Sequence, residues 1–254
     1  TYLCAPINSV GLAPRESTTL EQFHPPAMMS TLTGVNLLTG LNPATVTLPS
    51  NFTLHAVSKQ DVWRPPEVPE GEMYNTPATY VQYGPIHKFK SARVSICDMV
   101  GKKQFDQAGM ILLVNSPGLG LEKYDSWIKT GVEIIDKNST AKVMAVATPG
   151  GGYSDWNLVE MPSTKCVTIQ VERQKGGPWM YIYVLEGKKK TLMRLVTWPF
   201  QKHFDQMFGV GVFVARHEWA PGDIPFTGEP NSAKFEGLKI EWDNWNGTNS
   251  KYHV

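Results

Sequence analysis

A carboxyl and an amine lie on one face of a strand-like run in the middle of the chain. Side chains of a strand alternate between its two faces, so Lys129 and Glu133 share a face with Trp127. Such a pair could perform acid and base chemistry or hold a polar ligand. It could equally be an exposed ion pair worth less than about 1 kcal/mol. Glu133 and Lys129 are therefore candidate catalytic residues only if the protein is an enzyme.

Further polar and aromatic residues converge on this pair. If the preceding run pairs in register with that of Glu133, Gln107 joins Lys129 and Glu133. Trp63 and Trp156, each close to an aspartate, could supply flat apolar walls. Aromatic surfaces beside amide and charged groups suit a sugar, whose CH faces stack and whose hydroxyls need partners. The competing interpretation of both tryptophans is packing in the core or at its rim.

Arg194 and Asp155 complete the candidate ligand-binding residues. Arg194 could pair with Glu133 or with a surface carboxylate. Sandwich glucanases carry the pattern E-x-D-x-x-E on one strand, which places both catalytic carboxyls on the same face. The nearest match begins at Glu241 and has Asn246 as its last residue, so it lacks the proton donor. This weighs against a glucanase, although Glu133 and Asp155 could still form a carboxylate pair across strands.

The elements that must position these residues are short strands. Alternating or apolar runs recur between turn signals, with no helical period, which predicts an all-β, two-sheet antiparallel jelly-roll sandwich. We expect about a dozen strands, including three between Phe105 and Trp156. Residues 1–50 are interrupted by six prolines and form either a lid over a binding cleft or an arm shielding a sheet edge. The predicted sandwich domain covers residues 51–254.

Composition excludes several classes of partner. Lys and Arg number 24 against 23 Asp and Glu, which disfavours nucleic acid and anionic lipid. No run approaches the roughly 18 to 20 apolar residues needed to cross a bilayer. The sequence has no paired-cysteine metal motif, phosphate-binding loop or dinucleotide fingerprint, so we expect neither metal nor cofactor. The expected partner is a small molecule or a glycan, and the oligomeric state is not indicated.

Cysteines and sequons bear on location. Cys4, Cys97 and Cys166 allow one disulfide with a free thiol, or three free thiols. Glycosylation sequons begin at Asn51, Asn138 and Asn246, although about two are expected by chance. The sequence starts at Thr1 without a leader, as a processed secreted chain or a trimmed one would. Together these features favour a secreted over a cytoplasmic location without establishing it.

Four ordered motifs resemble a largely uncharacterised bacterial and fungal family. They are Asp61-Val-Trp-Arg, Phe105-Asp-Gln-Ala-Gly, Trp127-Ile-Lys-Thr-Gly-Val-Glu and Gly152-Tyr-Ser-Asp-Trp. Fungal members are described as regulation-of-enolase proteins, and the resemblance covers about residues 50 to 245. It implies a concanavalin A-like lectin/glucanase sandwich whose ligands lie across the concave face of one curved sheet.

Three functions from different classes fit these observations. The favoured one is lectin-like binding of a glycan or another polyhydroxylated ligand on the concave sheet. The alternative is an enzyme, such as a cyclase, isomerase or hydrolase of a small molecule in a fungal pathway, that uses Lys129 and Glu133 as acid and base. The third is a regulatory protein-binding module, as the family's fungal name suggests.

Overall fold

The described part of the chain is built from strands arranged in two large sheets. The computed structural model describes residues 50–56, 61–66, 73–74, 79–114, 126–175, 177–201, 207–217 and 231–243, all within one compact unit, Gly34–Val254. Residues 1–49 of the predicted lid or arm lie outside the described residues, and the boundary after residue 50 stays a prediction. Among the described residues the one helical element is a 3-10 turn, Ile86–Lys88, and no helix has the length and hydropathy to span a membrane.

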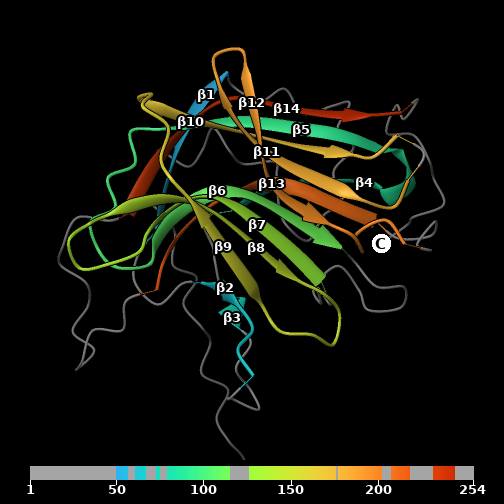
Figure 1. The fold of residues 1–254 in the computed structure, drawn as a ribbon, viewed down its shortest axis with the longest axis horizontal. Coiled ribbons are helices and arrows are strands. Elements are labelled where there is room, and N and C mark those ends of the chain that lie inside the picture. Colours follow the sequence, from blue (N-terminus) through green and yellow to red (C-terminus); the bar gives the residue numbers. More distant parts are fainter. Residues whose placement is uncertain are drawn as a thin grey trace, which may run out of the picture. The chain divides into compact units, whose positions relative to one another are not determined.

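The first sheet has six antiparallel strands in the order β1-β14-β5-β10-β11-β12 (Figure 1). Their bounds are β1 Asn51–Ala56, β5 Phe89–Cys97, β10 Cys166–Arg173, β11 Met180–Glu186, β12 Lys189–Val196 and β14 Asn231–Trp242. The burial of β10 and β11 alternates along the strand, as expected for a sheet with one face in the core and one facing water.

The second sheet also has six antiparallel strands, in the order β4-β13-β6-β7-β8-β9. Their bounds are β4 Thr79–Pro85, β6 Asp106–Val114, β7 Ser126–Ile134, β8 Ala141–Thr148, β9 Asp155–Val159 and β13 Met207–Arg216. Every residue of β6 and β7 is buried, on both faces of the strands. The second sheet therefore has an apolar layer on each side of its central strands.

The inner layer is the core between the two sheets. It takes the even-numbered side chains of β6 and β13, such as Met110, Leu112 and Val212, which are fully buried. Across the interface, the ring of Phe89 from β5 lies 4.8 Å from that of Phe208 from β13, centroid to centroid. Burial of β-branched and aromatic side chains between two sheets about 10 Å apart is the main force that stabilises a sandwich.

The outer layer is covered by a separate two-stranded element. Strands β2 (Val62–Trp63) and β3 (Met73–Tyr74) pair with each other and lie over the outer face of the second sheet (Figure 1). Val62 is fully buried there among apolar side chains of β6, β7, β8 and β13. The candidate site lies beside this contact.

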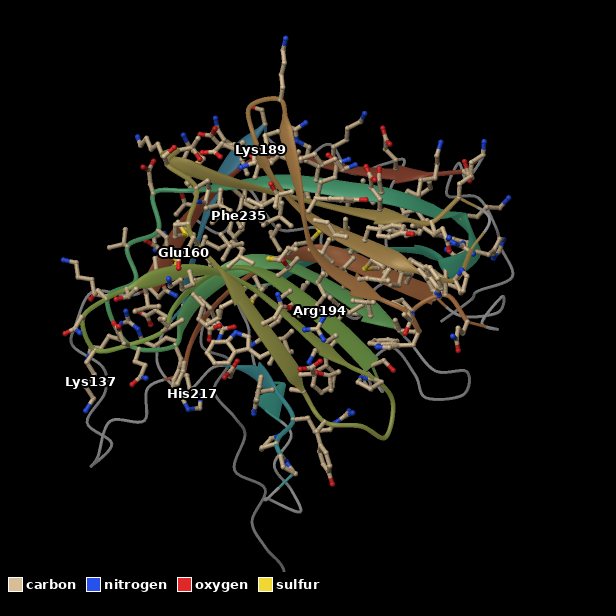
Figure 2. The ribbon with its side chains drawn as sticks, viewed as in Figure 1. Lys137, Glu160, Lys189, Arg194, His217 and Phe235 are labelled. Atoms are coloured by element: carbon tan, nitrogen blue, oxygen red, sulfur yellow. A yellow bond between two sulfur atoms is a disulfide. The ribbon has the colours of Figure 1, made fainter. Side chains whose placement is uncertain are left out.

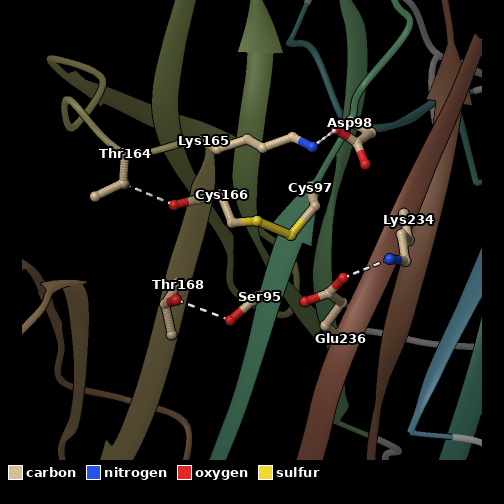
Figure 3. Close-up of a disulfide and its surroundings, with 9 residues drawn as sticks. All are labelled: Ser95, Cys97, Asp98, Thr164, Lys165, Cys166, Thr168, Lys234 and Glu236. Carbon is tan, nitrogen blue, oxygen red and sulfur yellow. Dashed lines mark hydrogen bonds and ion pairs between the residues drawn. A yellow bond between two sulfur atoms is a disulfide. The ribbon is translucent and has the colours of Figure 1, made fainter.

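A disulfide joins two neighbouring strands of the first sheet. Cys97 of β5 and Cys166 of β10 face each other in the register, with Cα atoms 4.3 Å apart (Figure 3). This resolves the choice that the sequence left open for these two residues, while Cys4 lies outside the described residues. Such bonds persist in oxidising compartments, which is compatible with the expected secreted location.

The predicted fold class is confirmed. The structure is an antiparallel two-sheet sandwich, and the three runs expected between Phe105 and Trp156 are β6, β7 and β8, with β9 beginning at Asp155. The register that was assumed for Gln107 is also correct, since Gln107 lies directly opposite Glu133.

Candidate functional site

The candidate site lies on the outer face of the second sheet, the face turned away from the first sheet. Odd-numbered side chains of β6 and β7 occupy this face, as the period-two alternation predicted for Gln107, Lys129 and Glu133. Much of the surrounding surface is apolar and buried beneath Val62. The apolar cluster comprises Val62, Ile111, Leu113, Trp127, Met144, Val146, Phe213 and Ala215.

Two facing glycines create the space in which the polar groups meet. Gly109 and Gly131 lie opposite each other on β6 and β7. A Cβ on Gly131 would come within 2.1 Å of the Ala108 carbonyl oxygen, and one on Gly109 equally close to that of Thr130. Only glycine fits so close an approach of two backbones.

The glycine row lets Lys129 reach across the sheet. Lys129 stands opposite Ile111 in the register, yet its Nζ donates a hydrogen bond of 2.7 Å to Oε1 of Gln107, beyond the glycines. The same Nζ donates to Oδ1 of Asp61 at 2.8 Å, and Nε2 of Gln107 donates to that oxygen at 3.0 Å. Lys129, Gln107 and Asp61 thus form a closed triangle of hydrogen bonds.

The triangle is buried, so its charges are removed from water and depend on each other for stabilisation. The exposed fraction is 1% for Lys129, 0% for Gln107 and 7% for Asp61. A buried ion pair holds together only if both charges are hydrogen-bonded, and loss of one partner costs about 3 to 5 kcal/mol. The alternative of an exposed, weak ion pair between Lys129 and Glu133 is wrong: Lys129 pairs with Asp61, and both residues of the expected pair are buried.

Asp61 is held as a carboxylate. Burial raises its pKa, but the charge of Lys129, the nearby His217 side chain and hydrogen bonds from Lys129 and the Val62 backbone outweigh that effect, so the pKa lies well below its usual range. The Val62 N–H donates to Oδ1 of Asp61 at 2.6 Å, and Nδ1 of His217 lies 3.2 Å from Oδ2. The aspartate therefore links the short strand β2 to the sheet and to the end of β13.

Glu133 behaves in the opposite way. Burial raises the pKa of its carboxyl to about 7; the charge of Lys129 opposes the rise and that of Asp61 adds to it. The nearby Trp156 side chain also lowers the pKa, but Oε2 is buried with no hydrogen-bond partner among the described residues. A carboxyl with a pKa near neutrality can both give and take a proton at physiological pH.

The two tryptophans take different places. Trp156 of β9 lies opposite Val146 and is 36% exposed, so part of its ring faces solvent beside Glu133. Trp63 is half-buried and packs against the apolar cluster, with Lys129 Nζ 5.8 Å from its ring centroid. Trp156 has the exposure of a ligand platform, whereas much of Trp63 serves the packing of β2. Their role in ligand binding stays a prediction.

Arg194 and Asp155 do not join this cluster. Nη2 of Arg194 lies 2.6 Å from Oδ2 of Asp155, and Nη1 donates to the Asn157 side chain at 2.9 Å (Figure 2). Asp155 precedes Trp156 in a strand, so the two side chains point to opposite faces of the sheet. The expected pairs of Glu133 with Asp155 and with Arg194 are therefore wrong, and the alternative of a surface carboxylate for Arg194 is correct.

A second buried network fixes the ends of the strands that carry the site. Arg216 of β13 and Asp106 of β6 form a two-pronged ion pair with both distances 2.7 Å, and both are buried. Nδ2 of Asn231 bridges the carbonyl oxygens of Gln107 and Ala215 at 3.1 and 2.7 Å. These bonds hold Gln107 and the chain just before His217 in place.

Sequence reasoning did not assign two members of the cluster. Asp61 was recognised only as part of a motif, and His217 was not among the candidate residues. Asp61 is 68 residues from Lys129 in the chain, so no local period could place them together. The usable signal was an aspartate beside a short apolar strand, since a buried lysine requires an acid.

Potential metal ligands are close together at one place in the part of the chain that the structure describes. Sulfur atoms of Cys97 and Cys166 lie near a carboxylate oxygen of Glu236. Both sulfurs are used in the disulfide (Figure 3), so they are not thiolate ligands.

Comparison with known sequences places this site in a family without an assigned activity. The family described as "protein of unknown function (DUF1349)" matches residues 41–242. The uncharacterized protein AN7484 of Emericella nidulans is 31% identical over 197 residues, which is 77% of this chain and 92% of that protein. The regulation-of-enolase name expected from the sequence is not confirmed by these matches.

Two solved structures that resemble this fold carry the names of enzymes that act on glycans. A xylan β-1,4-xylosidase from Bacillus halodurans C-125 superposes with a TM-score of 0.51 at 11% identity, over 76% of this chain and 33% of that one. A κ-carrageenase from Pseudoalteromonas carrageenovora, in complex with an oligotetrasaccharide, gives 0.42 at 10% identity, over 78% and 82%. This chain spans about a third of the length of the xylosidase. At such identities the likeness is one of fold.

Proposed function

The chain belongs to the DUF1349 family of unknown function, and we propose that it binds a glycan or similar polyhydroxylated ligand at the outer face of its second sheet. The observation that carries this proposal is the buried Oε2 of Glu133, which has no hydrogen-bond partner among the described residues. A buried acceptor without a donor costs about 1 to 3 kcal/mol. A ligand hydroxyl that donates to this oxygen removes that cost.

The groups around Glu133 offer both an apolar surface and polar groups, which suit the CH groups and the hydroxyls of a sugar. The partly exposed indole of Trp156 lies beside the carboxyl and offers a flat apolar surface to the CH face. Hydrogen bonds hold the side chains of Asp61, Gln107 and Lys129 in fixed positions relative to one another. A preorganised site loses less conformational entropy when it binds.

Trp156→Ala is the direct test of this proposal. Binding of neutral oligosaccharides is screened on a glycan array, and the best ligand is then measured by isothermal titration calorimetry. We expect Trp156→Ala to weaken binding about tenfold or more, in the range of one lost stacking contact. Glu133→Gln should weaken it as well, because the amide offers a poorer acceptor.

Trp179→Ala is a matched control. Trp179 is 38% exposed, close to the 36% of Trp156, and it adjoins β11 of the first sheet. Its removal should leave binding unchanged. If no neutral or acidic glycan binds, or if both tryptophan variants weaken binding equally, the proposal fails.

The raised pKa of Glu133 favours a second candidate, acid and base catalysis on a small molecule. A carboxyl with a pKa of about 7 is suited to proton transfer at neutral pH, and Lys129 lies close enough for its charge to lower that pKa. For any substrate that the protein converts, the rate should change with pH through a group near 7. Glu133→Gln should abolish turnover together with that pH dependence. Unchanged turnover in the variant would exclude this role.

A further inference from the structure

A basic hollow adjoins the cluster of Asp61 and Glu133. It measures about 360 Å³ and is open to solvent. We call it the basic hollow; its lining residues are Lys102, Lys103, Gln104, Phe105, Lys137 and His217. Figure 2 labels Lys137 and His217, which approach it from the segment after β7 and from the end of β13.

Two carboxylates in the segments beside the hollow, those of Asp106 and Asp136, accept hydrogen bonds from other groups. Asp106 binds Arg216 and also accepts hydrogen bonds of 3.0 Å from the backbone N–H groups of Lys102 and Lys103. Asp136 accepts from the backbone N–H groups of Asn138 and Thr140. No acidic residue is among the described residues that line the hollow. Asp136 keeps its negative charge, because backbone N–H groups are neutral, whereas Arg216 neutralises Asp106. Lys102 and Lys137 outnumber that one remaining charge, so the potential in the hollow is positive and attracts anions.

The wall of the hollow has a fixed backbone. Phe105 has φ of 66°, in the left-handed region that residues with a Cβ rarely adopt. Its N–H donates to the Ile134 carbonyl at 2.7 Å, and the Gln104 side chain donates to the Ile135 carbonyl at 3.1 Å. The Phe105 ring also meets His217 edge-on, with centroids 5.5 Å apart. Strained backbone held by several contacts is typical of functional sites.

His217 connects the hollow to the candidate site. Its ring lines the hollow, and its Nδ1 lies 3.2 Å from Oδ2 of Asp61. A positive charge on His217 also lowers the pKa of Glu133, so the two groups are close enough to interact. A ligand that reaches Glu133 could thus place a substituent in the hollow.

We propose that the basic hollow binds the anionic substituent of an acidic glycan, a carboxylate or a sulfate ester, through Lys102 and Lys137. This proposal rests on the proposed glycan binding and names the class of glycan. Lysines bind anionic oxygens mainly as point charges, so the recognition is electrostatic and weakens as salt rises.

The first test needs no sugar. Sodium sulfate is titrated into the 15N-labelled protein against sodium chloride at equal ionic strength, and amide shifts are followed by NMR. We expect saturable shifts at residues 102–105, 137 and 217. The shifts should vanish in Lys102→Gln/Lys137→Gln and remain in Lys188→Gln/Lys189→Gln, which removes the same charge at an exposed hairpin turn. Shifts that do not saturate, or that occur equally in both double variants, would overturn the proposal.

The second test compares matched ligands. Trigalacturonate is measured against its methyl ester, and sulfated lactose against lactose, by calorimetry. We expect the charged member of at least one pair to bind about tenfold more tightly, and the Lys102→Gln/Lys137→Gln variant to lose that advantage. The pair that shows the difference identifies the substituent.

The outcomes separate this proposal from the one on which it rests. Equal affinity for charged and neutral members of both pairs rejects the anion site and leaves glycan binding intact. Loss of the charged ligand's advantage in both lysine double variants also rejects it, because the effect would then come from net charge alone. Failure of every glycan to bind rejects the proposed function itself, and this proposal with it.

Discussion

Replacement of Glu133 by glutamine should change how stability depends on pH. The folded protein holds this carboxyl at a pKa of about 7, against an ordinary value of 4.5. A folded pKa above the unfolded value stabilises the protein at low pH, where the group is protonated in both states or only in the folded state. This stability is lost as pH rises from the unfolded pKa through the folded one.

The size of the effect follows from the shift. Each pKa unit corresponds to about 1.4 kcal/mol, so the full difference between the two values is worth about 3 kcal/mol. Most of it, about 2 to 3 kcal/mol, is lost between pH 5 and pH 8. Glutamine has the same shape but does not titrate. The Glu133→Gln variant should therefore gain that much stability relative to the native protein as pH rises over this interval.

Urea denaturation at pH 5, 6, 7 and 8 measures the difference. Subtracting the free energy of unfolding of the native protein from that of the variant at each pH removes the contributions of distant groups that the two proteins share. Glu160→Gln serves as the control (Figure 2). Glu160 pairs with Lys142, but its side chain is 85% exposed, so its difference should stay flat with pH. A flat difference for Glu133→Gln as well would refute the reasoning that burial raises its pKa.

Other predictions concern the groups that hold the site together. Lys129→Met should lower the free energy of unfolding by about 3 to 5 kcal/mol in urea, since it leaves Asp61 without its lysine; adding Asp61→Asn should restore part of this loss. Gly131→Ala should cost about 2 kcal/mol or more, because its Cβ would meet the Ala108 carbonyl oxygen at 2.1 Å; a variant as stable as the native protein would contradict this. Asp61→Asn should reduce the loss of stability on acidification below pH 4, because a carboxylate with a lowered pKa stabilises the fold only while ionised. Reduction of the disulfide, which spans 69 residues, should lower the free energy of unfolding of the native protein in urea by about 2 to 4 kcal/mol and should leave that of Cys97→Ser unchanged.

Period-two alternation predicted the parts of the site that lie on adjacent strands. Gln107 and Glu133 face each other, and Lys129 lies on the same face, because side-chain direction in a strand is set by position alone. The same rule excludes Asp155 as a partner of Glu133. Asp155 and Trp156 are neighbours in β9, so they cannot both point to the outer face, and only Trp156 does.

Long-range packing decided what alternation could not. A face that carries two charges looks solvent-exposed in the sequence, yet β6 and β7 are buried on both sides. The cover is β2, a strand of two residues that is too short to show a period. Asp61 directly precedes β2, so the packing of β2 on the sheet places Asp61 beside Lys129. Lys129, which was expected to lie at the surface, is therefore buried in the triangle with Asp61 and Gln107. Tertiary contacts of this kind have no local signature in one sequence.

The pKa values of the two acids of the cluster are displaced in opposite directions, and this is the basis of the proposed chemistry. Lys129 is hydrogen-bonded to Asp61, whose pKa lies well below its usual range, while burial and the charge of Asp61 help to raise that of Glu133. The charge of Lys129 therefore outweighs burial at Asp61 but only partly opposes it at Glu133, whose pKa stays about 7. If this division is correct, Asp61→Asn should lower the pKa of Glu133, because it removes a nearby negative charge. Carboxyl 13C shifts of Glu133 measured against pH would detect the change, and an unchanged or higher pKa would show that Asp61 does not act on Glu133 through its charge.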